Sequence, residues 1–102
     1  MQVETKQNVV TGYIFQLTTT DIVVSGFSWN PDAVLVAQVN TDSYDLKSFG
    51  YGTGYVARQT SIAGRINIEQ LILGTNQVTV RIRNDDSSEP TWRSVIVTAV
   101  KT

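Results

Sequence analysis

The sequence predicts an all-β protein, a small antiparallel β-sandwich or flattened barrel of about 7–8 strands. Residues 77–83 alternate strictly, with Val78, Val80 and Ile82 on one face and polar or charged side chains on the other. This period of two is typical of a strand with one buried face. Runs rich in Val, Ile and Thr recur between turn residues. No long segment carries the 3.6-residue period of an amphipathic helix.

The composition predicts one folded domain, residues 1–102, and removes several classes of site. Hydrophobic residues make up 41% of the chain and charged residues 17%, with no cysteine and no histidine. Disulfides and thiolate metal sites are therefore excluded, and the commonest general base and metal ligand is missing. No apolar run is long enough to cross a bilayer, and the start of the chain lacks a signal-peptide pattern. We expect a soluble protein without catalytic residues, cofactor or metal, and without membrane insertion.

The first third of the chain predicts two strands. Residues 8–17 form a long β-type run in which Gly12 is a candidate bulge. The polar residues 18–21 are expected to form its turn, and residues 22–27 the next strand. Pro31, which has no N–H to give to a sheet, breaks the pattern within residues 28–32.

The middle of the chain combines one strongly apolar strand with one long loop. Residues 33–40 place Val34 and Val36 opposite Leu35, Ala37 and Val39, so this strand is expected to be buried on both faces. Residues 40–55 are polar and then alternate aromatic residues with glycine. So long an irregular stretch in a compact domain is usually functional, which makes it the candidate working loop.

Strands are expected again at residues 54–60 and 64–73. In the second of these, Ile66 and Ile68 face inward, and a change of register near Gln70 brings Leu71 and Leu73 to the same face. A short helix over residues 68–73 is the alternative, because the segment ends at Gly74 as helices often do. We favour the strand.

The chain is expected to close with a hairpin, in which residues 77–83 pair with residues 91–100. Arg81, Arg83 and Arg93 lie on these strands and are candidates to share one face. Nucleic-acid binding is disfavoured, since the isoelectric point is about 5.1 and acidic residues adjoin the arginines. Carboxylates of the same chain or of a neighbouring subunit are the expected partners.

The charge distribution and the tryptophans also suggest contacts. Residues 1–51 hold two lysines against five carboxylates, a net charge of −3, whereas residues 52–102 carry +2. This asymmetry suits contacts between an acidic and a basic end of subunits, but we favour the simpler interpretation of solvated strand faces. Trp29 and Trp92 are expected to be core or interface anchors.

Several candidate ligand sites can be weighed on their residues. The glycines of residues 49–55 lack the flanking helix of a phosphate-binding loop. The acidic residues of 42–45 and 84–89 lack EF-hand spacing and are read as turn residues in solvated loops. The aromatic residues of the central loop are candidates to contact a partner or a glycan, or to fill one end of the sandwich; these are Tyr44, Phe49, Tyr51 and Tyr55.

Two segments resemble a known family. Residues 27–36 run from Phe27 through Pro31 into a Val-rich strand, and residues 91–100 form an aromatic-bearing last strand that ends in Val and Ala. Together with their surroundings they resemble the small β-sandwiches of tailed-bacteriophage virion proteins, of the H-type-lectin-like fold. That resemblance implies a trimer, a place in phage fibres or a lectin, and sugar binding at subunit boundaries. The absence of histidine departs from the lectins, so no binding residue is carried over.

The expected function is therefore non-enzymatic assembly. The chain would be a bacteriophage virion component, such as a capsid decoration or cement, head-fibre or tail protein, located in the virion after assembly in the host cytoplasm. It would act as a homo-oligomer, with a trimer favoured, and contact other virion proteins. The alternative is a carbohydrate-binding module for a cell-surface glycan. In it the four loop aromatics form a platform, and Arg81, Arg83 or Asp85 bonds the sugar hydroxyls.

Overall fold

The computed structural model describes residues 1–8, 10–42, 45–49, 58–60 and 66–102. These residues form nine strands and no helix, so the predicted all-β class is confirmed; no helix among them is long and apolar enough to span a membrane. The strands are β1 (Gln2–Asn8), β2 (Gly12–Tyr13), β3 (Thr18–Ser25), β4 (Ala33–Thr41), β5 (Asp45–Phe49), β6 (Arg58–Thr60), β7 (Ile66–Gly74), β8 (Gln77–Asn84) and β9 (Thr91–Lys101).

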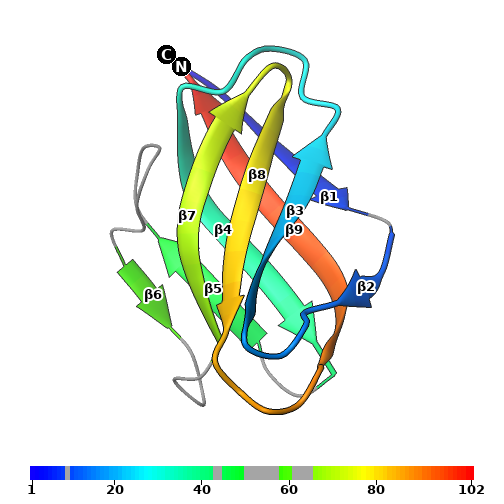
Figure 1. Cartoon of the computed structure of the whole chain (residues 1–102). Helices are drawn as coiled ribbons and strands as arrows, with labels where there is room; N and C mark the ends of the chain where they lie inside the picture. Colours follow the sequence, from blue (N-terminus) through cyan, green and yellow to red (C-terminus); the bar gives the residue numbers. More distant parts are fainter. Residues whose placement is uncertain (9, 43–44, 50–57, 61–65) are drawn as a thin grey trace.

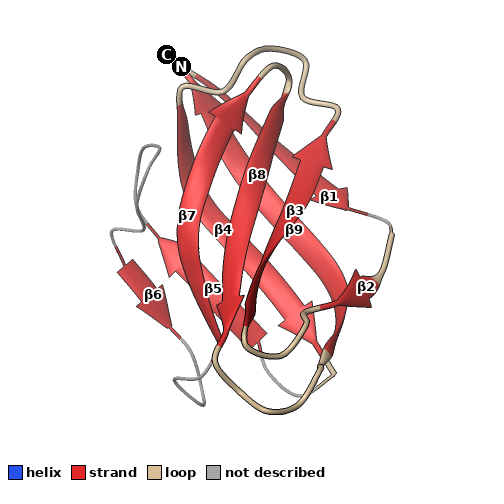
Figure 2. Cartoon of the chain, in the orientation of Figure 1, coloured by secondary structure: helices blue, strands red, loops and turns tan. Residues whose placement is uncertain are grey.

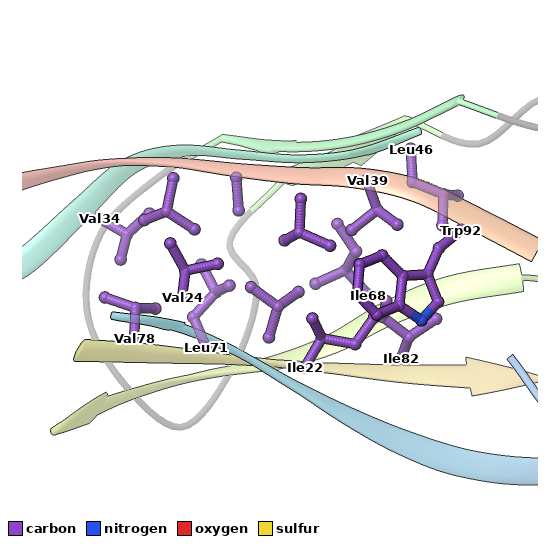
Figure 3. Close-up of a cluster of buried hydrophobic side chains, with 14 of the residues drawn as sticks. Ile22, Val24, Val34, Val39, Leu46, Ile68, Leu71, Val78, Ile82 and Trp92 are labelled. Carbon is purple, nitrogen blue, oxygen red and sulfur yellow. The ribbon is translucent and has the colours of Figure 1, made fainter. Parts of the chain in front are cut away.

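The strands form two antiparallel sheets that pack face to face, as Figures 1 and 2 show. One sheet has the order β1-β9-β4-β5-β6, with β2 also paired to β9, and the other has the order β3-β8-β7. The core lies between them, and Figure 3 shows its aliphatic side chains and Trp92 interleaved. Both chain ends lie together at one end of the sandwich (Figure 1). This is a β-sandwich, in which each sheet buries one face.

The strand β8 keeps the alternation that the sequence predicts, but its partners are different. Val78, Val80 and Ile82 are fully buried. However, β8 pairs with β3 and β7, whereas β9 belongs to the opposite sheet. The predicted closing hairpin is therefore wrong. Alternation is a local property of one strand, while the choice of a pairing partner depends on the whole chain.

The strand β7 confirms the predicted change of register. Its pairing with β8 shifts between Ile68 and Gln70, so that Ile66, Ile68 and Leu71 are all buried and Leu73 packs against the core. The alternative helix is excluded by this continuous ladder. A β-bulge explains how residues three apart reach the same face.

A second register shift corrects the pattern expected in β4. Its pairing with β9 skips from Val34 to Val36, and Val34, Ala37 and Val39 are buried while Val36 is half-buried. Val34 and Val36 therefore do not share a face, and β4 has one buried face rather than two. After the irregularity between Val34 and Val36, the side chains that face the core change from even-numbered to odd-numbered positions. A pattern of strict alternation does not predict such a change.

The strand boundaries near the N-terminus also differ from those expected. The run 8–17 is divided between the end of β1, the short β2 and a loop, whereas the predicted turn 18–21 lies inside β3. The predicted break at 28–32 is confirmed as non-strand. The predicted loop 40–55 contains β5, and of the predicted strand 54–60 the described part is β6.

The strand β1 has an inverted pattern that hides it in the sequence. Val3 is exposed, whereas the polar side chains of Glu4 and Asn8 are half-buried and bond to Ser28, which follows β3, and to Val23 of β3. The Glu4 carboxylate accepts a hydrogen bond from the Ser28 backbone N–H at 2.9 Å, and the Asn8 amide donates to the Val23 carbonyl at 2.7 Å. Hydrogen bonds rather than apolar burial thus hold this edge of the sandwich.

Candidate functional site

The predicted aromatic loop is largely outside the described residues. Tyr44, Tyr51 and Tyr55 lie outside them, and Phe49 is the last residue of β5, with its side chain likewise outside the description. Their contact with a partner or a glycan therefore stays a prediction.

The three predicted arginines do not form one surface. Arg81 and Arg83 lie on β8, whereas Arg93 lies on β9 in the opposite sheet. The expectation of a shared face therefore fails for Arg93. Two sheets that bury their facing sides present their exposed side chains in opposite directions.

Arg81 is the most firmly bound of these side chains. Its Nε and Nη2 atoms donate to the two carboxylate oxygens of Asp21 at 2.8 and 3.0 Å, and its Nη1 donates to Gln70 Oε1 at 2.7 Å. Asp21, Arg81 and Gln70 stand opposite one another on β3, β8 and β7. A bidentate pair of this kind satisfies both partners. Arg81 therefore stabilises its own sheet and offers little to an external anion.

The other two arginines also have carboxylate partners on the same chain. Arg83 Nε lies 2.8 Å from Asp85 Oδ1, and Arg93 Nη2 lies 3.7 Å from Asp45 Oδ1. The predicted pairing with acids of the same chain is thus confirmed. Because both pairs are solvent-exposed, each contributes little to stability.

The Asp21–Arg81 pair predicts a specific acid sensitivity. The hydrogen bonds from Arg81 hold the pKa of the Asp21 carboxyl below its ordinary value and raise the pKa of Arg81. A lowered folded-state pKa gives stability that is present above the unfolded-state pKa, about 4, and is lost as the pH falls through the folded-state pKa. We expect Asp21→Asn to make the acid-induced loss of stability smaller, as measured by urea unfolding at pH 7 and at successively lower pH.

A double-mutant cycle checks this prediction. Arg81→Gln alone should reduce the acid dependence as Asp21→Asn does, and the two substitutions together should add nothing further. Glu4 and Asp32 also have lowered pKa values, because each accepts hydrogen bonds from Ser28 and from Thr102 respectively. Both carboxylates are present in every variant, so they make the same contribution to the acid dependence of the free energy of unfolding in each. An additive double mutant would show that the pair is not the source.

The acidic loops are occupied by hydrogen bonds of the backbone. Asp42 accepts from the Thr91 N–H, and Asp86 accepts from the Ser87 N–H. Within the residues that the structure describes, no group of three or more acidic side chains is placed to hold a metal ion. These loops connect strands, and their carboxylates satisfy turn N–H groups.

One side of the sandwich gathers most of the exposed apolar surface. Seven large hydrophobic residues of the described chain are exposed, and two of them, Met1 and Val3, lie at the start of β1. The other five lie on or beside β2 and β3, and four of them, all except Leu17, line one groove. We call this set the apolar flank; it comprises Val10, Tyr13, Phe15, Leu17 and Val23. Monomers rarely leave so many large apolar side chains together in water.

A groove opens on the apolar flank. Its volume is about 490 Å³, and its walls include Val10, Tyr13 and Phe15 from one side and Ile22 from β3. Trp92 contributes to the same lining and is only 7% exposed. This volume is within the range of small-ligand and side-chain binding pockets.

The absence of a side chain at Gly12 keeps the base of the groove open. A Cβ atom at this position would lie 2.9 Å from Trp92 Nε1, which is closer than real Cβ atoms come to a neighbour, and 3.2 Å from Cε2. The indole N–H makes no hydrogen bond with any described residue. Trp92 therefore supplies both an apolar surface and an unused donor beside Gly12.

In the loop between β2 and β3, Ile14 is buried and hydrogen-bonded, whereas its neighbours are exposed. Ile14 is fully buried; its N–H donates to the Pro90 carbonyl at 3.0 Å, and its carbonyl accepts from the Asn84 amide at 2.9 Å. Leu17 has a positive φ of 54°, a left-handed conformation that costs a non-glycine residue about 1–2 kcal/mol. A strained, exposed leucine is an unusual choice for a turn that glycine or asparagine would fill without strain.

The exposure of the apolar flank could not be predicted from the sequence pattern. Tyr13, Phe15 and Leu17 alternate as in a half-buried strand, yet they flank the buried Ile14 and point outward. The sequence assigns all three to one half-buried strand, whereas the structure exposes them and places Tyr13 in the short β2 and the other two in the following loop. The alternating signal was present, but it did not show which face is covered.

The fold and this surface define the chain as a small antiparallel β-sandwich with an apolar groove on one side. Comparison with known protein families, with curated proteins and with solved structures gives no match.

Proposed function

We propose that this protein is a non-enzymatic structural protein that assembles with further copies of itself through the apolar flank. The observation that carries the proposal is the concentration of exposed Val10, Tyr13, Phe15, Leu17 and Val23 on one side of the sandwich. Covering large aromatic and aliphatic side chains is the main source of free energy in subunit association. The flank is the surface that best fits this role within the described residues.

The polar groups around the groove support a protein partner over a sugar. The Asn8 amide is bonded to the Val23 carbonyl and the Val10 N–H, and the Asp21 carboxylate is bonded to Arg81. Tyr13, Thr20 and Trp92 keep polar groups that make no hydrogen bond with a described residue. A sugar needs several placed polar partners for its hydroxyls, and the amide and the carboxylate of the groove are already used. Glycan binding therefore remains the alternative, resting on the loop aromatics and not on this groove.

The resemblance of residues 27–36 and 91–100 to tailed-phage β-sandwiches supports a place for this assembly. We propose a virion component, such as a capsid decoration, head-fibre or tail protein, which contacts other virion proteins. A β-sandwich by itself hosts many functions. The proposal of self-assembly therefore rests on the apolar flank, and the proposal of a virion location rests on the resemblance alone.

Solution mass tests the assembly proposal. Light scattering over a dilution series should give a multiple of the 11.3 kDa chain mass. Phe15→Asp should reduce the mass to that of one chain, because the flank would then carry a charge that must be dehydrated on association. Thr75→Asp adds the same charge in the exposed turn after β7 and should leave the mass unchanged. A wild-type monomer at every concentration, or equal effects of both substitutions, would contradict the proposal.

A further inference from the structure

We infer that the apolar flank forms a twofold contact, in which Leu17 of each copy inserts into the groove of the other. The inference rests on the proposed assembly and specifies its geometry: the same surface on both copies and a dimer as the basic unit. The resemblance to trimeric phage proteins implies a different symmetry, so the two can be told apart.

Leu17 is the part of the flank suited to insertion. It is 60% exposed, and it is the one flank residue that does not line the groove. The loop that carries it is held by the buried Ile14 and by the bond from the Thr18 hydroxyl to the Phe15 carbonyl at 2.9 Å. A projecting apolar side chain on an anchored loop loses little conformational entropy when it docks.

The groove has the complementary chemistry. Trp92 is more than nine-tenths buried, lines the groove and has an unpartnered N–H beside Gly12. This donor is open to the groove, where an inserted acceptor can reach it. A loop that inserts Leu17 also brings backbone carbonyl oxygens, so apolar contact and hydrogen bonding would be met by the same segment.

Charge and composition favour a second copy as the occupant. The groove's one ionised side chain, Asp21, is neutralised by Arg81, so an uncharged apolar group is the matching partner. In the described chain, such groups are exposed mainly on the flank itself. The apolar flank holds both Leu17 and the groove that would receive it, so the flank is self-complementary. Self-complementary surfaces associate around a twofold axis. A stable contact buries about 800 Å² per partner, for which neighbouring flank side chains are needed as well.

The test combines mass with the fluorescence of Trp92. In a Trp29→Phe background, Trp92 is the single tryptophan, so acrylamide quenching reports access to the groove. We expect a concentration-dependent dimer with Trp92 protected from quenching. Leu17→Gly removes the projection and suits the left-handed conformation, so it should stay folded, be monomeric and leave Trp92 several-fold more accessible. Thr75→Asp is the matched control and should behave as the wild type.

Each outcome supports or overturns the inference. A trimer, or a dimer in which Trp92 is as accessible as in Leu17→Gly, overturns the twofold insertion and leaves the proposed assembly standing. A chain that is monomeric at all concentrations overturns both. Circular dichroism of each variant confirms that a lost dimer is not a lost fold.

Discussion

Asn84→Ala is expected to lower the free energy of unfolding by about 3 kcal/mol or more. Asn84 is fully buried at the end of β8. Its amide donates to the Ile14 carbonyl at 2.9 Å and to the Ser88 carbonyl at 2.8 Å, while its oxygen accepts from the Asp86 N–H at 2.8 Å. Alanine would leave three backbone groups without these partners, at the point where the chain crosses between the sheets. Urea unfolding followed by circular dichroism measures the loss.

Asn30→Ala provides the matched control for this substitution. Asn30 is exposed, and its side-chain oxygen accepts one hydrogen bond, from the Asn76 N–H at 3.0 Å. We expect it to cost less than about 1 kcal/mol. If the two substitutions cost the same, the Asn84 amide does not hold the crossover together. Asn84→Asp, which keeps the acceptor and removes both donors, should be nearly as harmful as alanine.

Trp92→Ala is expected to cost about 3–5 kcal/mol, because it removes a large buried side chain and leaves a cavity. Trp92 is 7% exposed and packs within the core cluster, as Figure 3 shows. Gly12 lies directly against its indole ring, so the substitution would also remove the side-chain packing between β2 and β9. Thermal and urea unfolding should both report the change.

Trp29→Ala separates this effect from the general loss of a tryptophan. Trp29 is half-buried and stacks on Phe27, with ring centroids 6.1 Å apart. We expect a cost of about 1–2 kcal/mol, since part of the ring already meets water. Equal costs for the two substitutions would contradict the different burial of the two residues. The sequence treats both tryptophans alike, and only their surroundings distinguish them.

The candidate site was predicted less well than the fold. The arginines were recognised with acids of the same chain as partners, but Asp21 and Arg81 are 60 residues apart in sequence, so the pairing of individual side chains could not be read from spacing. The groove unites Gly12, Ile22 and Trp92 from three strands. Contacts over such separations depend on sheet topology, which strand patterns do not encode.

The sequence alone determined the all-β class, the buried face of β8 and the register change in β7. Each follows from local periodicity, because successive side chains on a strand must point to opposite faces. The tertiary structure decided that β8 and β9 belong to different sheets, that Glu4 and Asn8 bond to Ser28 and Val23, and that Tyr13 and Phe15 remain exposed. The physical reason is that pairing and burial are settled between segments far apart in the chain, where each strand competes for a limited number of partners.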